Sequence, residues 1–168
     1  NHTFQYVVDQ LTEDNVYSDP DIQRPNGNWD LEMKQSAIRS YCYRRVSAPI
    51  VLADVKECLE WSTTKTSHNR YSVEYYEALI NKDYKYVILD GNHKRNDVLL
   101  AFFNNQWTYT GTLIDHERKE QEFINTYFKD LPDSYRIHLM NCMVPVMIHG
   151  DLIAQELSGT FIDLQKGK

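Results

Sequence analysis

Several features that would narrow the function of this 168-residue chain are missing from its sequence. Its cysteines are few and odd in number (Cys42, Cys58 and Cys142) and form no Cys-x-x-Cys pair, which excludes a disulfide framework and favours a reducing, cytoplasmic compartment. No stretch is long and apolar enough to predict a membrane span, and no signal peptide is recognisable. Without repeats or low-complexity segments either, residues 1–168 are expected to form one globular domain. The chain begins without Met, as a fragment of a longer protein would.

The sequence also lacks an excess of positive charge. It contains 18 Lys and Arg residues against 24 Asp and Glu, which gives a formal net charge of −6. Because phosphate neutralisation supplies most non-specific DNA affinity, we expect this segment to bind duplex DNA weakly and not to cut it. One basic cluster, Arg39, Arg44 and Arg45, could contact DNA, although a solvated helix face is the simpler explanation.

Hydrophobic periodicity predicts strands and helices that alternate along the chain. The expected strands cover residues 48–55, 86–90, 107–114 and 144–148, and the expected helices cover 30–45, 72–81, 116–127, 131–142 and 151–157, with a further helix after residue 93. Residues 6–11 fit either a short strand or the start of a helix, and residues 56–69 read as a polar insertion. In the first of the longer helices, Leu31, Ile38 and Cys42 are expected to face inward. The interleaving predicts an α/β (mixed α+β) fold.

A buried strand that ends in Asp90 and Gly91 carries the most informative pattern. The polar residues Asn92, His93 and Lys94 follow, and apolar residues at helical spacing come next, so the pattern predicts a strand, a tight turn and a helix. The first backbone N–H groups of a helix have no intrahelical partner and the helix dipole is positive there, which suits an anion. Gly91 lets a phosphate approach the backbone, Asn92 can cap the helix, and Asp90 can hold a cation or orient a water. An ordinary capped helix start without a ligand is the alternative.

His138 and Cys142 stand four residues apart, a spacing that suits two metal ligands on one helical turn. No second pair at ligand spacing is evident, so the sequence does not predict a zinc site. His116, Glu117 and Glu120 fit a solvated helix face. No Ser-His-Asp order and no Cys-His pattern indicates a nucleophilic centre.

Three separated pieces of the chain resemble one known family. The pieces are Asp21-Ile22-Gln23-Arg24-Pro25 with Trp29, Leu89-Asp90-Gly91-Asn92-His93-Lys94 and Phe161-Ile162-Asp163-Leu164-Gln165-Lys166-Gly167. In this order they resemble the N-terminal domain of GmrSD-type proteins, which belongs to the ParB/sulfiredoxin-fold superfamily and carries an Asp-Gly-Gln-Gln-Arg motif. A Lys34-Gln35 pair also matches the family. The sequence Asp-Gly-Asn-His followed by Lys is nearest to ParB-like and serine-kinase-like members.

The resemblance implies a small mixed sheet with surrounding helices that binds a nucleoside triphosphate together with Mg²⁺. It implies that Asp90 and His93 are catalytic and that Asp90 holds the Mg²⁺. The residues that would bind the nucleotide are Gln23, Arg24, Gly91, Asn92 and Lys94. Members of the family act in DNA restriction and phage conflict, where a separate nuclease module cuts the DNA. The expected function is therefore an NTP-hydrolysing domain that reaches DNA through another module.

Other functions stay open alongside this one. The family's Arg is Lys94 here, and Lys lacks the planar two-point recognition of phosphate that Arg provides. The alternatives are a kinase acting on a small molecule or a modified DNA base, a non-catalytic module in which nucleotide gates homodimerisation, and a ParB-like nuclease. In the kinase, His93 or Asp90 would be the base that takes the proton of the acceptor hydroxyl.

Overall fold

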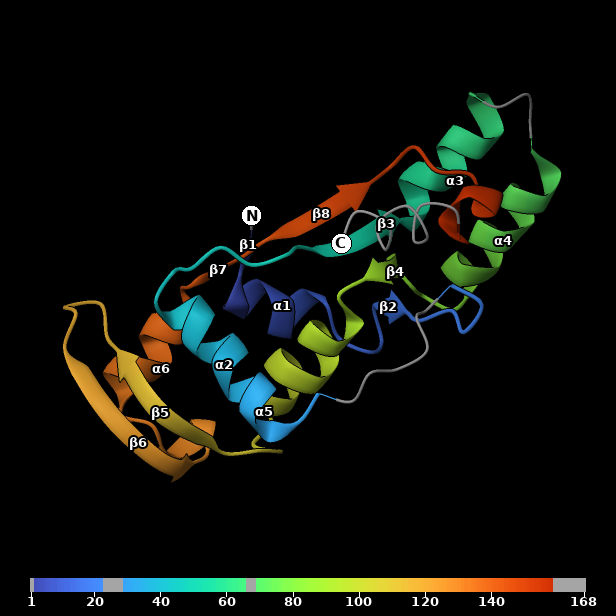
Figure 1. Cartoon of the computed structure of the whole chain (residues 1–168). Coiled ribbons are helices and arrows are strands. Elements are labelled where there is room, and N and C mark those ends of the chain that lie inside the picture. Colours follow the sequence, from blue (N-terminus) through green and yellow to red (C-terminus); the bar gives the residue numbers. More distant parts are fainter. Residues whose placement is uncertain (1, 23–28, 66–68, 159–168) are drawn as a thin grey trace. The chain divides into compact units, whose positions relative to one another are not determined.

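The computed structural model describes residues 2–22, 29–65 and 69–158 of the chain, which forms two compact units. The first unit contains residues 1–12, 27–48 and 93–145, and the second contains residues 13–26, 49–92 and 146–168. Both units combine helices and strands, which confirms the predicted α/β (mixed α+β) class (Figure 1). Within the described ranges, no helix combines the length and the apolar character needed to span a membrane. The ParB-like arrangement and the single domain stay predictions.

The second unit is built on a four-stranded sheet in the order β2-β4-β3-β8 (Figure 1). The strands are β2 (Val16–Tyr17), β3 (Ile50–Asp54), β4 (Tyr86–Asp90) and β8 (Val146–His149). β4 runs antiparallel to β3, whereas β2 and β8 run parallel to their neighbours. The two central strands, β3 and β4, are the buried strands that the sequence predicts. Because Asp90 is the last residue of β4, this central strand positions the first residue of the predicted site.

Helices α3 (Val55–Thr64) and α4 (Arg70–Asn81) complete the core of the second unit. The core cluster combines Val51, Ala53, Val87 and Leu89 of the sheet with Val55, Cys58, Tyr76 and Leu79 of the helices. The sheet residues alternate along β3 and β4, so they share one face of the sheet. Each large apolar side chain buried in this way contributes about 1.5–3 kcal/mol. The end of β4 is therefore anchored in a well-packed core.

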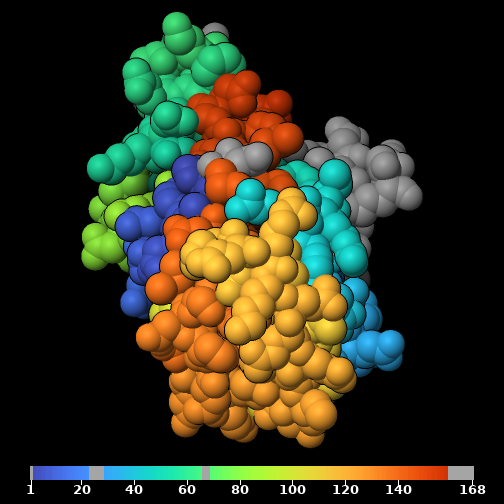
Figure 2. Space-filling view, turned by 90° about the vertical axis from the view of Figure 1, so that its left-hand side faces the viewer, coloured from blue at the N-terminus to red at the C-terminus, as the bar shows by residue number. Residues whose placement is uncertain are grey.

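The first unit consists of helices, a hairpin and a second short pair of strands. Its helical segments are α1 (Phe4–Gln10), α2 (Leu31–Cys42), the π-helix η1 (His93–Leu100), α5 (Ala101–Phe103), the 3₁₀ turn η2 (Phe128–Asp130) and α6 (Asp133–Met140). Its strands form two antiparallel pairs, β5 (Tyr109–Ile114) with β6 (Glu120–Thr126) and β1 (His2–Thr3) with β7 (Met143–Val144). Figure 2 shows the β5–β6 hairpin and α6, in yellow to orange, on the face turned toward the viewer.

Helix η1 begins within the predicted site and is held by buried side chains. Val98 and Leu99 are fully buried, and Trp107 Nε1 donates to the carbonyl of Val98 at 3.3 Å. Arg95 is only 1 % exposed, and its Nη1 donates to the carbonyl of Leu11 at 2.7 Å. This bond joins η1 to the end of α1. π-Helical turns are rare and are frequent at functional sites, which makes this segment a candidate for one.

The predicted helix over residues 116–127 is wrong, because a turn and then β6 occupy this range. Asp115 stabilises the turn, since its Oδ1 accepts the N–H groups of Glu117 and Lys119, both at 2.9 Å. Along β6, Phe123 is buried while its neighbours are exposed, which is the two-residue period of a strand. The charged composition fits a surface helix and a surface strand alike, and pairing with β5 decides between them.

The polar insertion predicted over residues 56–69 is also wrong, because α3 covers most of this range. Asp54 caps the helix with its side chain. Val55, Cys58 and Ser62 are buried at helical spacing and form the inward face of α3. Two of these three residues are small or polar, which is why the helical pattern is weak in the sequence.

Other predicted elements are confirmed with local changes. Residues 6–11 lie largely in helix α1, which decides between the two interpretations of this segment. In α2, Ile38 and Cys42 are buried as expected, whereas Leu31, the first residue of the helix, is 46 % exposed. The strand predicted over residues 144–148 is divided between β7 and β8.

Candidate functional site

The predicted segment crosses the boundary between the two units, and each half is described by itself. In the second unit, Asp90 is 8 % exposed, and its Oδ1 accepts the N–H of Gly91 at 2.9 Å. Gly91 has a φ of +87°, and a Cβ there would lie 3.0 Å from the Cα of Ile50. Both features require glycine at this position. The side-chain amide of Asn92 donates to Ser18 Oγ at 3.5 Å.

In the first unit, His93 and Lys94 begin η1, and each contacts a specific partner. His93 Nδ1 lies 2.7 Å from Asp97 Oδ2, four residues further along the same helix. Lys94 Nζ donates to Ser47 Oγ at 3.2 Å and to the carbonyl of Ala48 at 2.9 Å. Both acceptors belong to the loop that follows α2. These two predicted residues are therefore held in place by side-chain contacts.

The His93–Asp97 pair has the geometry of a general acid–base group. With the proton on Nδ1 facing the carboxylate, the imidazole is fixed in one tautomer and Nε2 presents a lone pair. Nε2 makes no hydrogen bond with any residue that the structure describes. The His93 side chain is 30 % exposed.

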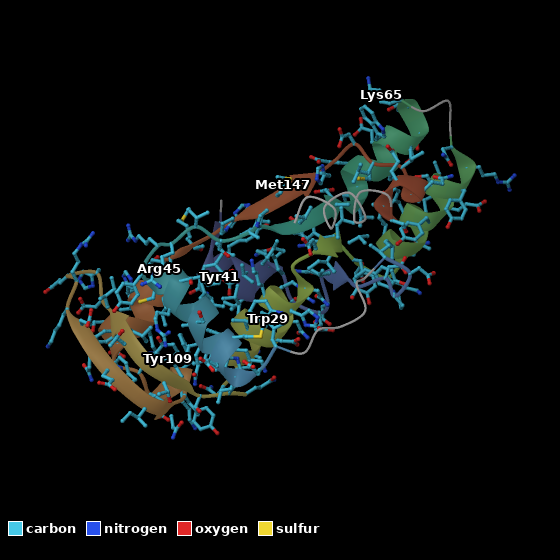
Figure 3. All side chains as sticks on the ribbon, in the orientation of Figure 1. Trp29, Tyr41, Arg45, Lys65, Tyr109 and Met147 are labelled. Carbon is cyan, nitrogen blue, oxygen red and sulfur yellow. The ribbon has the colours of Figure 1, made fainter. Side chains whose placement is uncertain are left out.

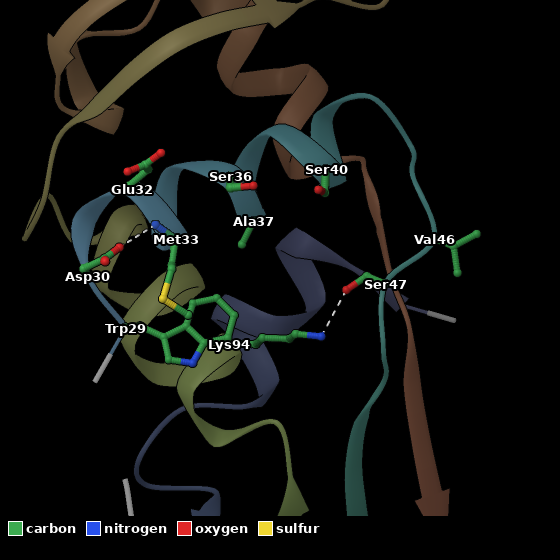
Figure 4. A pocket seen from close by; sticks show the side chains of 10 residues that line it. All are labelled: Trp29, Asp30, Glu32, Met33, Ser36, Ala37, Ser40, Val46, Ser47 and Lys94. Carbon is green, nitrogen blue, oxygen red and sulfur yellow. Dashed lines mark hydrogen bonds between the residues drawn. The ribbon is translucent and has the colours of Figure 1, made fainter. Parts of the chain in front are cut away.

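Lys94 also lines an open cavity of about 480 Å³ in the first unit (Figure 4). The lining residues are Trp29, Asp30, Glu32, Met33, Ser36, Ala37, Ser40, Val46, Ser47 and Lys94. The charged groups among these described lining residues are one ammonium and two carboxylates, and the carboxylate of Asp30 caps α2 by accepting the N–H of Met33 at 2.9 Å. A cavity of this volume is large enough for a small organic ligand.

Tyr41, on the last turn of α2, is 2 % exposed (Figure 3). Its hydroxyl is the one fully buried side-chain N or O atom without a hydrogen-bond partner among the residues that the structure describes. Burial raises the pKa of this phenol, and the nearby Ser47 hydroxyl works against that shift. Ser47 is therefore close to Tyr41 as well as to Lys94.

Some of the other residues that the sequence singles out lie in the described part of the chain, and some do not. Gln23 and Arg24 lie outside the described residues, as does the segment 161–167. Trp29 lines the cavity of the first unit, as a residue that shapes a pocket would. Gln35 donates to a backbone carbonyl just before β5 at 3.0 Å, so its amide joins α2 to the hairpin.

The described residues contain no group of three or more His, Cys, Asp or Glu side chains that could hold a metal ion. His138 Nε2 lies 3.0 Å from the carbonyl of Cys42, and Cys142 Sγ donates to the carbonyl of His138 at 3.1 Å. Burial raises the pKa of the Cys142 thiol to about 12. Asp90 is a single carboxylate, and in nucleotide sites Mg²⁺ is usually bound by one or two carboxylates, with phosphate oxygens and water as its other ligands.

Not all three arginines of the basic cluster, which the sequence offers as a possible DNA contact, are exposed in the fold. Arg39 donates to the hydroxyl of Tyr109 at 3.0 Å and to the carbonyl of Thr110 at 3.3 Å. Its guanidinium therefore joins α2 to β5. Arg44 and Arg45 are exposed, which leaves two of the three cations on the surface.

Sequence reasoning missed Asp97, Ser47 and Arg95. The four-residue spacing of His93 and Asp97 is a pattern that could have indicated their contact. Ser47 gives no such pattern, because it is 47 residues away from Lys94 in the chain. Nothing in the sequence separates the buried Arg95 from an ordinary surface arginine.

Comparison of the chain with protein-family models, with curated proteins and with solved structures gives no match. The geometry of the site therefore carries the functional conclusion.

Proposed function

We propose that this chain binds a nucleoside triphosphate with Mg²⁺ through residues 90–94 and hydrolyses it. The observation that supports this most strongly is the 2.7 Å contact between His93 and Asp97 at the start of η1. It brings an acid–base group to a helix start that follows a glycine turn, where a phosphate can approach the backbone. The same segment carries the resemblance to ParB-like nucleotide-binding domains.

Three properties of the segment suit a phosphate chain. The positive φ of Gly91 allows close approach to the backbone. The start of η1 is the positive end of its dipole, and Lys94 adds a full positive charge there. Asp90 would hold Mg²⁺, and the bound ion would neutralise part of the phosphate charge.

In the proposed reaction, His93 Nε2 takes a proton from a water molecule as the water oxygen attacks the γ-phosphorus. The new oxygen–phosphorus bond forms while the bond between the γ-phosphorus and the bridging oxygen breaks. The nucleoside diphosphate leaves with that electron pair, and His93 then releases its proton to solvent. Asp97 stabilises the imidazolium that exists between these steps.

Calorimetric titration with each nucleoside triphosphate and Mg²⁺ tests the binding step. The wild type is expected to bind at least one of them, and Asp90→Ala is expected to lose at least about tenfold in affinity, as removal of one charged ligand does. Asp151→Ala, which changes an exposed carboxylate in the second unit, is the control and should bind like the wild type. A wild type that binds no nucleoside triphosphate contradicts the proposal.

A second candidate is phosphotransfer, which the cavity lined by Lys94 favours because it has room for an acceptor molecule. The acceptor hydroxyl would then replace water, and His93 Nε2 would take its proton. Labelled ATP with small-molecule and modified-base acceptors separates the two reactions. Label on an acceptor supports the kinase, whereas label released only as free phosphate supports hydrolysis.

A further inference from the structure

Apolar side chains gather at one end of the cavity of the first unit. Trp29, Met33 and Ala37 form this apolar end, with the carboxylates of Asp30 and Glu32 beside it, and Ser47 and Val46 lie at the opposite end, here called the polar end (Figure 4). The stem of Lys94 begins beside Trp29, and its Nζ points toward Ser47 at the opposite end (Figure 4). A ligand that matches this arrangement has a flat apolar part and a polar or anionic part.

The apolar end is shaped to receive a ring. Trp29 is half-buried and directly precedes Asp30, whose cap bond to the N–H of Met33 fixes the start of α2. Met33 is 45 % exposed, and its flexible thioether can adapt to an aromatic neighbour. An indole face beside such a side chain is a suitable surface for stacking a nucleobase.

The polar end contains hydrogen-bond donors that an anion could use. The Ser47 hydroxyl donates to the carbonyl of Ala48 at a long 3.4 Å, and Lys94 Nζ lies 3.2 Å from the Ser47 oxygen. An anion beside Lys94 would accept from both the ammonium and the Ser47 hydroxyl, and hydrogen bonds to an anion are stronger than bonds between neutral groups.

The charges of the cavity limit how much phosphate it accepts. Among the described residues that line it, Lys94 is the one cation, and Asp30 and Glu32 are carboxylates. The ammonium can pair with one anionic group, whereas a whole triphosphate would also be repelled by the two carboxylates.

We infer that this cavity holds the nucleoside end of the nucleotide, with the base stacked on Trp29 and the first phosphate beside Lys94 and Ser47. The inference rests on the proposed function and adds the recognition of the base to it. Trp29 then decides how strongly a nucleoside is preferred over bare phosphates.

Calorimetry with Mg²⁺ and either ATP or inorganic tripolyphosphate tests this, because tripolyphosphate has the phosphates without the nucleoside. The wild type is expected to bind ATP at least about fivefold more tightly, the smallest effect usual for base stacking. Trp29→Leu is expected to abolish this preference without changing the affinity for tripolyphosphate. Trp61→Leu, in the second unit, is the matched control and should keep the preference.

A second variant decides the question if Trp29→Leu does not fold. Ala37→Met keeps a good helix former in α2 but fills the apolar end of the cavity, so it should also abolish the preference for ATP. Equal affinities in the wild type, or a preference unchanged in both variants, overturn the inference and leave nucleotide binding intact. A wild type that binds neither ATP nor tripolyphosphate overturns the inference and the proposed function together.

Discussion

Each unit contains a cavity that a tryptophan and a lysine line, and these two cavities differ in how their charges are held. The cavity of the first unit, of about 480 Å³, contains Trp29 and Lys94, and that of the second unit, of about 400 Å³, contains Trp61 and Lys65. Two carboxylates line the first cavity, and three line the second, which are those of Glu57, Glu60 and Asp151. The balance of charge is therefore less unfavourable to an anion in the first cavity.

The lysines of the two cavities differ in burial and in hydrogen bonding. Lys94 is half-buried and donates to Ser47 and Ala48, so its charge has a fixed position. Lys65 is exposed beyond the last turn of α3 (Figure 3). An exposed lysine loses side-chain entropy when it orders around a ligand, which offsets most of the gain. A tryptophan and a lysine near each other therefore do not suffice for an anion site, and the fixed position of the cation distinguishes the first cavity.

The largest expected effect concerns one histidine in each unit. His93 lies 2.7 Å from the Asp97 carboxylate, whereas His149 lies 4.0 Å from that of Asp151. His93→Gln is expected to lower kcat for phosphate release by about 10²–10⁴-fold with nucleotide binding retained, because general-base catalysis is lost. His149→Gln is expected to leave kcat unchanged. Equal rates in the two variants, measured by phosphate release under saturating nucleotide, contradict the assigned role of His93.

The next effect compares the two lysines directly. Lys94→Met removes a fixed cation and is expected to weaken nucleotide binding about 10- to 100-fold, the usual range for a charge-assisted hydrogen bond. Lys65→Met should leave the affinity within about twofold, as for an exposed charge. Titration calorimetry at one ionic strength measures both. If Lys65→Met weakens binding as much as Lys94→Met does, the nucleotide does not occupy the first cavity.

A smaller effect is expected from removing one of the carboxylates that line a cavity. Glu32→Gln removes a carboxylate from the first cavity and should strengthen nucleotide binding by about two- to tenfold at low salt, with the gain fading as salt rises. Glu60→Gln makes the same change in the second cavity and should have no effect on binding. An affinity gain that does not depend on salt would mean that Glu32 acts through packing and not through charge.

The smallest effect concerns acid stability, which should differ between the units. The backbone N–H of Lys119 lowers the pKa of Asp115, and partial burial opposes this. A lowered pKa in the folded chain means that the carboxylate stabilises the β5–β6 turn above the unfolded pKa near 4 and loses this contribution as the pH falls through the folded value. Hydrogen exchange should therefore show the first unit loosening in acid, and Asp115→Asn should remove that pH dependence. Identical acid profiles for Asp115→Asn and the wild type contradict this.

The sequence predicts those elements whose buried residues are large and apolar. The strand over residues 86–90 and the helix over residues 72–81 have such patterns, and both are confirmed. Helix α3 escapes prediction because Cys58 and Ser62 form part of its buried face. Strand β6 is not predicted because Phe123 is its one buried residue, and a single apolar position does not define a two-residue period. In both cases tertiary packing, which the sequence does not display, decides the local structure.

The candidate site, too, can be predicted only where its residues are close together in the sequence. The consecutive residues from Asp90 to Lys94 are recognisable because a strand, a glycine and a helix start follow one another in the chain. Ser47 and Tyr41 come from another segment and join Lys94 only through the fold of the first unit. Asp97 could have been predicted from its helical spacing to His93, which is a local relation. The contact between Lys94 and Ser47 follows no sequence spacing, so it could not be predicted in this way.

The position of the nucleotide is decided by a crystal structure of the chain with Mg²⁺ and a non-hydrolysable ATP analogue. We expect density for the base against Trp29, with the first phosphate within hydrogen-bond distance of Lys94 Nζ. An analogue bound beside Trp61 in the second cavity, or bound with Trp29 and Lys94 untouched, would show that the first cavity is not the nucleoside site.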